Sequence, residues 1–170
     1  DANKSMLAAG KLSVENGAHI VTQQFLDSFL ILSGSGITFG LVIAMLFAAK
    51  SKQYKALGKV AAFPALFNVN EPVVFGFPIV MNPVMFLPFI LVPILAAVVV
   101  YGSIAIGFMQ PFSGVTLPWS TPAIISGFMV GGWQGAIVQV IVLGISTLVY
   151  FPFFKFQDKL AYANELEAEK

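Results

Sequence analysis

The residues best suited to chemistry form one short polar stretch, residues 68–72 (NVNEP), inside a long apolar region of this 170-residue sequence. Glu71 is the only charged residue between Lys59 and Lys155. A carboxylate at the centre of a lipid bilayer costs about 2.5–3.5 kcal/mol, and such residues mark substrate, ion or proton sites by default. Pro72 cannot donate a backbone hydrogen bond, so the backbone here must be covered by protein or line a wet cavity. We therefore expect Glu71 to lie in a polar site at membrane depth.

A carboxylate flanked by amides suits a neutral polyhydroxy ligand such as a sugar. Glu71 accepts hydrogen bonds from hydroxyl groups, and the amides of Asn68 and Asn70 both donate and accept them. The indole of Trp119 has an apolar face that suits a pyranose ring, and a position in an interfacial aromatic belt suits the same side chain equally. The expected substrate-binding residues are Glu71, Trp119, Asn68, Asn70, Ser120 and Thr121.

Two other uses of Glu71 stay open at this stage. The carboxylate suits an ion or proton site, which would make the protein an ion-coupled secondary transporter. It also suits a structural cap that accepts hydrogen bonds from the free N–H groups of the helical arm that follows it. A third possibility is a membrane scaffold fragment that transports nothing. Asp27 and His19 are expected to be packing or interface residues, and we expect no catalytic residue in this chain.

The composition identifies a membrane protein and excludes several kinds of site. Hydrophobic residues make up 58% of the sequence and charged residues 10%, whereas soluble domains carry about 25% charged residues. A net charge of +1 and the absence of arginine argue against a nucleic-acid partner. The chain has no cysteine and a single histidine, so we expect no metal site and no cofactor.

These residues must be positioned by an all-α membrane protein with about three transmembrane helices and two re-entrant helical hairpins entering from opposite faces. At 1.5 Å per residue, the first span would reach about 45 Å, which exceeds a hydrocarbon core of about 30 Å. It must therefore tilt, break near its glycines, or begin outside the bilayer. The expected spans are residues 20–49, 85–108 and 133–154, and the expected hairpins are residues 60–84 and 109–131.

Lysines indicate which side of the membrane the loops occupy. Four lysines and no acid lie in residues 50–59, and Lys155 and Lys159 follow the last span. Clusters of this kind mark the cytoplasmic side. We expect an N-terminal loop or surface helix over residues 1–19, a membrane-embedded substrate-binding domain over residues 20–154, and a solvated cytoplasmic tail over residues 155–170. The opening reads like the middle of a longer membrane protein.

Residues 67–83 (FNVNEPVVFGFPIVMNP) resemble the signature of enzyme IIC, the membrane permease component of the bacterial sugar phosphotransferase system. The resemblance is to the lactose, cellobiose and chitobiose branch. Residues 50–52 (KSK) before this stretch and residues 118–122 (PWSTP) after it fit the same branch in order. The resemblance runs through nearly the whole chain and covers the C-terminal, substrate-binding part of the family protein.

The resemblance implies sugar transport across the bacterial cytoplasmic (inner) membrane, coupled to phosphoenolpyruvate-dependent phosphorylation. The sugar would be a β-linked disaccharide such as cellobiose, chitobiose or lactose. The phosphoryl group would come from a phosphocysteine on the partner enzyme IIB, which is loaded by enzyme IIA, so this chain would be one component of a protein-phosphocysteine–sugar phosphotransferase.

Carried over to this sequence, the resemblance implies that Glu71 binds a sugar hydroxyl near the phosphorylation site and that Trp119 stacks on the sugar. His19 does not match the histidine that the family uses. That histidine, and the N-terminal half that forms most of the family's homodimer interface, would lie before Asp1.

Overall fold

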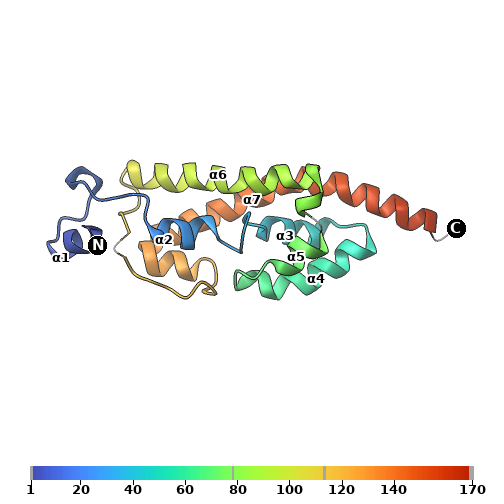
Figure 1. Ribbon diagram of the computed structural model, residues 1–170, viewed down its shortest axis with the longest axis horizontal. Coiled ribbons are helices and arrows are strands. Elements are labelled where there is room, and N and C mark those ends of the chain that lie inside the picture. Colours follow the sequence, from blue (N-terminus) through green and yellow to red (C-terminus); the bar gives the residue numbers. More distant parts are fainter. Residues whose placement is uncertain (1, 78, 113, 169–170) are drawn as a thin grey trace.

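The computed structural model describes residues 2–77, 79–112 and 114–168, and its regular secondary structure within these ranges is entirely helical. Figure 1 shows α6 (Pro83–Ala105) and α7 (Ile125–Ala168) extending along the long axis of the molecule, with α1 (Ala2–Ala8) apart at the N-terminal end and the two termini at opposite ends. The all-α fold class is therefore confirmed. The elements in chain order are α1 (Ala2–Ala8), the 3₁₀ helix η1 (Val14–Asn16), α2 (Gln23–Phe25), the π-helix η2 (Leu26–Leu30), α3 (Phe39–Ala48), α4 (Lys52–Leu66), α5 (Glu71–Gly76), the 3₁₀ helix η3 (Ile79–Met81), α6 (Pro83–Ala105) and α7 (Ile125–Ala168).

Two helices in the described part of the chain are long and apolar enough to cross a membrane, namely α6 and α7. Helix α6 has 23 residues and continues through Pro88 and Pro93. At 1.5 Å per residue it is about 35 Å long, which is enough for a hydrocarbon core of about 30 Å. Helix α6 thus coincides closely with the second expected span.

Helix α7 consists of two helices that meet at Gly132. The backbone of Gly132 has φ 65° and ψ −158°, which is not helical and which glycine adopts without a steric penalty. A short helix precedes Gly132 and a long helix follows it. This break lies at the expected boundary between the second interrupted segment and the last span.

The segment expected to be the first span, residues 20–49, is broken in the middle. Helix η2 ends at Leu30 and α3 begins at Phe39. Between them, Gly34 and Gly36 have φ of 83° and 78°. Of the three alternatives that the sequence left open, the break near the glycines is the one observed. Helix α3 has ten residues and therefore spans only about 15 Å.

Polar side chains on one face of α7 satisfy the backbone of this broken segment. The Ser146 hydroxyl donates to the carbonyl oxygen of Ile37 at 2.5 Å, and the Tyr150 hydroxyl donates to that of Gly36 at 2.8 Å. Gln139 donates to a carbonyl oxygen of η2 at 2.6 Å. Spacings of seven and four residues place these three side chains on one helix face. Backbone carbonyl groups of the broken segment are thus hydrogen-bonded inside the protein, as a membrane interior requires.

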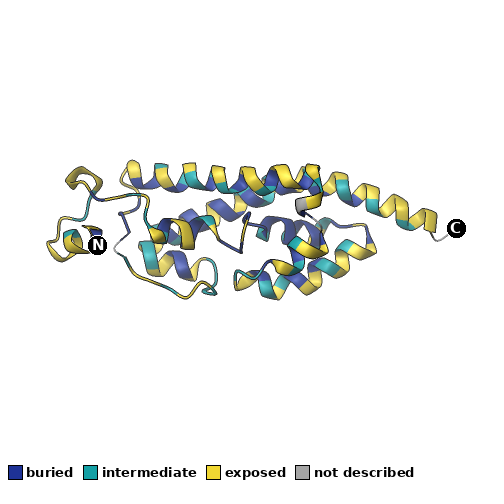
Figure 2. Ribbon diagram, viewed as in Figure 1, coloured by how far each residue is buried: buried dark blue, intermediate teal, exposed yellow. Residues whose placement is uncertain are grey.

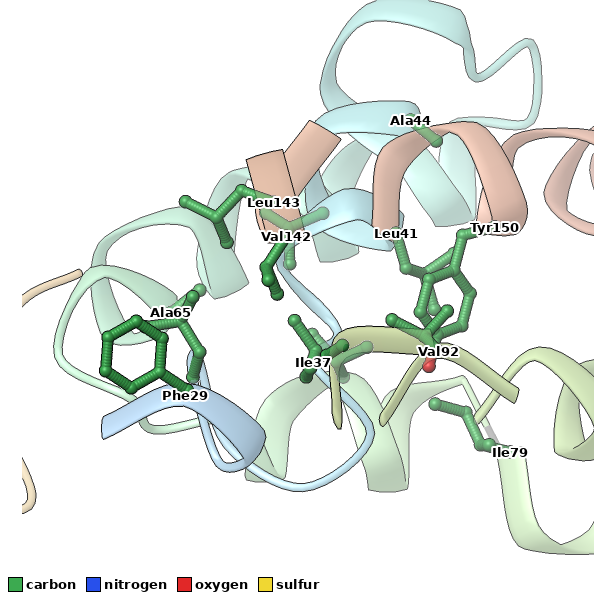
Figure 3. Packing of buried hydrophobic residues seen from close by; sticks show 14 of the residues in the cluster. Phe29, Ile37, Leu41, Ala44, Ala65, Ile79, Val92, Val142, Leu143 and Tyr150 are labelled. Atoms are coloured by element: carbon green, nitrogen blue, oxygen red, sulfur yellow. The ribbon is translucent and has the colours of Figure 1, made fainter. Parts of the chain in front are cut away.

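The apolar core lies between the broken segment, α6 and α7. Figure 3 shows Ile37, Val92 and Val142 gathered in one cluster, and each of these side chains is fully buried. Figure 2 shows that much of the remaining surface of α6 is exposed. That surface is apolar and includes Ile94 and Val98, which are 54% and 65% exposed. Apolar exposure on this scale suits a helix that faces lipid or further protein.

Most of residues 155–168 are exposed, as expected for a solvated tail, but two carboxylates in this stretch bond to the start of α4. Asp158 is buried, and its carboxylate accepts hydrogen bonds from the backbone N–H groups of Lys50 (2.9 and 3.0 Å) and Ser51 (3.0 Å). Glu165 accepts a hydrogen bond from the Ser51 hydroxyl at 2.6 Å and from the next two backbone N–H groups at 3.0 and 3.1 Å. These bonds lower the pKa of the Glu165 carboxyl below its usual value. Both carboxylates satisfy free N–H groups at the positive end of α4, which explains why this part of the tail packs on the protein.

Candidate functional site

The expected site lies on the turn between α4 and α5. Residues 67–70 form this turn, and Glu71 is the first residue of α5. Pro72 occupies the first turn of the helix, where a missing N–H group costs nothing because it would have no helical partner. Asn68 has φ 63°, in the left-handed region that asparagine tolerates better than most residues. The NVNEP sequence thus encodes an abrupt reversal followed by a new helix.

The side chain of Glu71 is exposed. None of the residues that the structure describes forms a hydrogen bond or an ion pair with its carboxylate, and α5 begins without a side-chain cap hydrogen bond. A structural cap would require such a bond, so the geometry gives that alternative no support. Both carboxylate oxygens are therefore available to a ligand.

The Asn70 side chain points into the protein. It is 7% exposed, and its amide donates to the Ser35 carbonyl oxygen at 2.7 Å and to the Thr38 hydroxyl at 3.2 Å. A Cβ atom at Gly34 would lie 2.4 Å from the Asn70 side chain. Asn70 therefore joins the turn to the broken segment, and both of its amide hydrogens are used within the chain.

The Asn68 side chain joins three segments at one point. Its Oδ1 atom accepts a hydrogen bond from the backbone N–H of Ser33 at 2.6 Å. Its Nδ2 atom donates to the carbonyl oxygens of Trp119 at 2.7 Å and Thr121 at 3.0 Å. The turn that carries Glu71 is therefore bonded directly to the loop that carries Trp119. Figure 1 shows this loop, which precedes α7, reaching the α4–α5 turn midway along the molecule.

The loop that carries Trp119 has no regular secondary structure. A tight turn folds it locally, because the backbone N–H and the hydroxyl of Thr121 donate to the Pro118 carbonyl oxygen at 3.0 and 2.7 Å. The Trp119 side chain is 69% exposed, and Ser120 is partly exposed. The loop thus presents an exposed indole, and the turn to which it is bonded presents an exposed carboxylate.

Two residues excluded from the expected site lie elsewhere. His19 pairs through its backbone with the side chain of Asn3, donating at 2.8 Å and accepting at 2.8 Å. Asp27 is exposed and accepts hydrogen bonds from the Gln23 amide at 2.9 and 3.0 Å. Among the described residues, neither forms a hydrogen bond with the α4–α5 turn.

Sequence reasoning missed two hydroxyl residues that support the site from behind. The Ser33 hydroxyl donates to the Ala65 carbonyl oxygen at 3.1 Å, and the Thr38 hydroxyl donates to the Ser33 carbonyl oxygen at 3.3 Å. Both are buried. The available signal was the cluster of serine, glycine and threonine at residues 33–38, of which only the glycines were used, as a place where the first span could break.

A family model described as "Phosphotransferase system, EIIC" matches residues 1–93. The lichenan permease IIC component of Bacillus subtilis (strain 168) is 43% identical over 171 residues, which cover 98% of this chain and 37% of that protein. The lactose-specific EIICB component of Lacticaseibacillus casei is 33% identical over 171 residues, which cover 99% of this chain and 29% of that protein.

A similar solved structure is that of the transporter ChbC, the IIC component of the N,N'-diacetylchitobiose-specific phosphotransferase system. It superposes with a TM-score of 0.89 at 38% identity, over 96% of this chain and 37% of ChbC. The chain therefore spans less than two-fifths of the length of the proteins it matches.

Proposed function

Because the chain belongs to the EIIC family of the phosphotransferase system, we propose that it forms the sugar-binding part of a bacterial permease. The permease moves a sugar across the cytoplasmic membrane while a partner phosphorylates it from phosphoenolpyruvate. This chain binds the sugar and presents one of its hydroxyl groups. The phosphoryl transfer itself uses a group on the partner.

The observation that carries this proposal is that the turn with the exposed Glu71 carboxylate is bonded to the loop with the exposed Trp119 indole. Asn68 ties the two backbone segments together through hydrogen bonds of 2.7 and 3.0 Å. A carboxylate accepts hydrogen bonds from ring hydroxyls, and an indole face packs on the apolar face of a pyranose. Partly exposed Ser120 and Thr121 add hydroxyl groups to the same surface.

The substrate class is a β-linked disaccharide such as cellobiose, chitobiose or lactose. The named substrates of two similar proteins, lactose and N,N'-diacetylchitobiose, are both β-linked disaccharides. A disaccharide also suits a site with an apolar platform and a carboxylate on neighbouring segments, because one sugar unit can stack while its hydroxyls are bound.

In the membrane, we place residues 60–84, which include the α4–α5 turn, and residues 109–131 as two re-entrant hairpins entering from opposite faces. The broken segment 20–49, α6 and the long part of α7 are the three membrane-crossing units. Four lysines in residues 50–59 support a cytoplasmic position for the start of α4. The end of α7 is bonded to that same start, which supports a cytoplasmic C-terminal end as well.

The partner that supplies the phosphoryl group is enzyme IIB, itself loaded by enzyme IIA. Support comes from the lactose-specific relative, whose EIICB name joins a IIC and a IIB part in one protein. The chain has no cysteine to carry a phosphoryl group itself.

We also propose that the whole permease is a homodimer.

Uptake measurements in cells that express the intact permease test this function. Sugar is expected to accumulate in phosphorylated form, to require phosphoenolpyruvate and enzyme IIB, and to continue after a proton uncoupler is added. Accumulation of unmodified sugar that the uncoupler abolishes would instead indicate an ion-coupled transporter. A folded, membrane-inserted protein with no uptake and no sugar binding would indicate a scaffold.

Replacing Trp119 with alanine is expected to weaken disaccharide binding by about 1–3 kcal/mol, as for other truncated aromatic anchors. The physical reason is the loss of the apolar surface under the sugar ring. Isothermal titration of the purified permease measures the change. The control is Trp133→Ala, because Trp133 is 58% exposed but packs edge-on against Phe108, which follows the C-terminal end of α6. Equal affinities of the Trp119 variant and wild type would assign Trp119 to an interfacial belt.

A further inference from the structure

The hydrogen bonds of Asn68 leave little of its side chain available to a ligand. An asparagine amide has two N–H donors, and here both are used on carbonyl oxygens of the Trp119 loop. Its oxygen accepts the Ser33 N–H at 2.6 Å, which leaves one lone pair unused. Direct donation to a sugar, as expected from the sequence, would require these internal bonds to break.

The Trp119 loop depends on these bonds for its position. It contains Pro118 and Pro122, which have no N–H to donate, and its indole is 69% exposed and so does not anchor it. In the described part of the chain, every hydrogen bond that ties residues 114–121 to another segment comes from Asn68. Without them, residues 114–121 retain only their own turn at Pro118, and the next hydrogen bond to another segment is that of Ile124 with Gln139.

We infer that Asn68 is a positioning residue of the sugar site: its amide holds the Trp119 loop against the turn that carries Glu71. This inference rests on the proposed function and assigns different roles to the residues of the site. Glu71 and Trp119 touch the sugar, and Asn68 fixes the spacing between them. Asparagine is suited to the position because it combines a left-handed backbone, φ 63°, with a planar group that donates on one side and accepts on the other.

The substitution Asn68→Asp separates these properties. Aspartate has the same size, tolerates the left-handed backbone and retains the acceptor for Ser33. It has no N–H groups, so it places a negative charge against the two carbonyl oxygens that Asn68 now bonds. Asn68→Gly is the second variant, because glycine retains the backbone conformation and removes every side-chain bond.

The control is Asn82→Asp. The Asn82 oxygen accepts from the backbone N–H groups of Val84 and Met85 and from the Gln157 amide, at 3.0, 3.4 and 3.0 Å. Aspartate preserves these acceptor bonds, so the same chemical change is made away from the turn without removing a donated hydrogen bond. Thermal unfolding of each variant identifies those that fold as wild type does.

The decisive measurement is a double-mutant cycle on disaccharide affinity in the intact permease. We expect Asn68→Asp to weaken binding at least about fivefold in the wild-type background, the lower end of the loss expected from Trp119→Ala. In a Trp119→Ala background, the same substitution is expected to change affinity less than about twofold. The coupling arises because Asn68 acts through the position of the indole.

Four results would overturn the inference. An equal loss in both backgrounds would show that Asn68 does not act through Trp119. Unchanged affinity in both folded Asn68 variants would show that the loop needs no anchor. An unaltered affinity of Trp119→Ala alone would leave Asn68 nothing to position, while sugar binding by wild type would still support the proposed function. Failure of wild type to bind any tested disaccharide would reject the proposed function and the inference together.

Discussion

Replacing Glu71 with glutamine is expected to weaken disaccharide binding by about 1.5–3 kcal/mol, a factor of about 10 to 150, while the protein still folds and inserts. Glutamine has the same shape as glutamate but replaces one acceptor oxygen with a donor and removes the charge that strengthens hydrogen bonds from hydroxyls. Among the described residues, none bonds to this carboxylate, so the substitution removes no internal contact. We therefore expect disaccharide affinity and sugar phosphorylation to decrease while the stability of the fold stays unchanged.

Titration calorimetry with cellobiose, N,N'-diacetylchitobiose and lactose measures this effect, and thermal unfolding of the same samples checks the fold. Glu167→Gln is the matched control, because Glu167 is an exposed glutamate near the end of α7, far along the chain from the turn. Full affinity in Glu71→Gln would remove Glu71 from the site. A loss of folding instead of binding would assign the carboxylate a structural role.

Replacing Gln139 with leucine is expected to destabilise the protein by about 3–5 kcal/mol. Gln139 is fully buried, and its oxygen accepts from the backbone N–H groups of Ile124 at 2.5 Å and Gly127 at 3.0 Å. Its amide donates to the Ser28 carbonyl oxygen at 2.6 Å and to the Ser126 hydroxyl at 2.9 Å. Leucine fills the space but leaves these groups unpaired, at about 1–3 kcal/mol each before relaxation.

Ile124 depends on one of these bonds for its backbone conformation, because it has φ 72°, which a β-branched residue adopts only when its surroundings impose it. The hydrogen bond from its N–H to Gln139 is one such constraint. Thermal unfolding in detergent measures the change, and Gln134→Leu on the same helix is the control, since Gln134 is only partly buried. A melting temperature equal to that of the control would show that the four bonds contribute no net stability.

The parts of the fold that were predictable from sequence depend on local signals. The NVNEP turn and the approximate position of α6 follow from proline and hydropathy patterns over a few residues, and the break at the Gly34–Gly36 cluster was one of three alternatives that these patterns left open. The site residues Glu71 and Trp119 were identifiable because charge and indole are rare in an apolar region, although their binding role is a prediction that the experiments above address.

The parts that were not predictable depend on partners far apart in the sequence. Asp158 lies in a charged, helix-forming stretch typical of a solvated tail, yet it bonds to Lys50, 108 residues away. The amides of Asn68 and Asn70 have the right chemistry for a sugar, and no local pattern reveals that the fold uses their donors internally. A long-range polar contact of this kind needs only one residue at the right position on a helix. It therefore produces no repeating pattern in the sequence.

The polar face of α7 also determines the order in which the segments of this chain can insert into the membrane. Within this chain α7 is synthesised last, yet Gln139 and Ser146 supply the partners for backbone groups made 111 and 109 residues earlier. Until α7 emerges, the broken segment around Gly36 carries unpaired carbonyl groups that lipid cannot satisfy. The broken segment must therefore stay in contact with water or the insertion machinery until α7 is made. Its insertion is complete only when α7 packs against it.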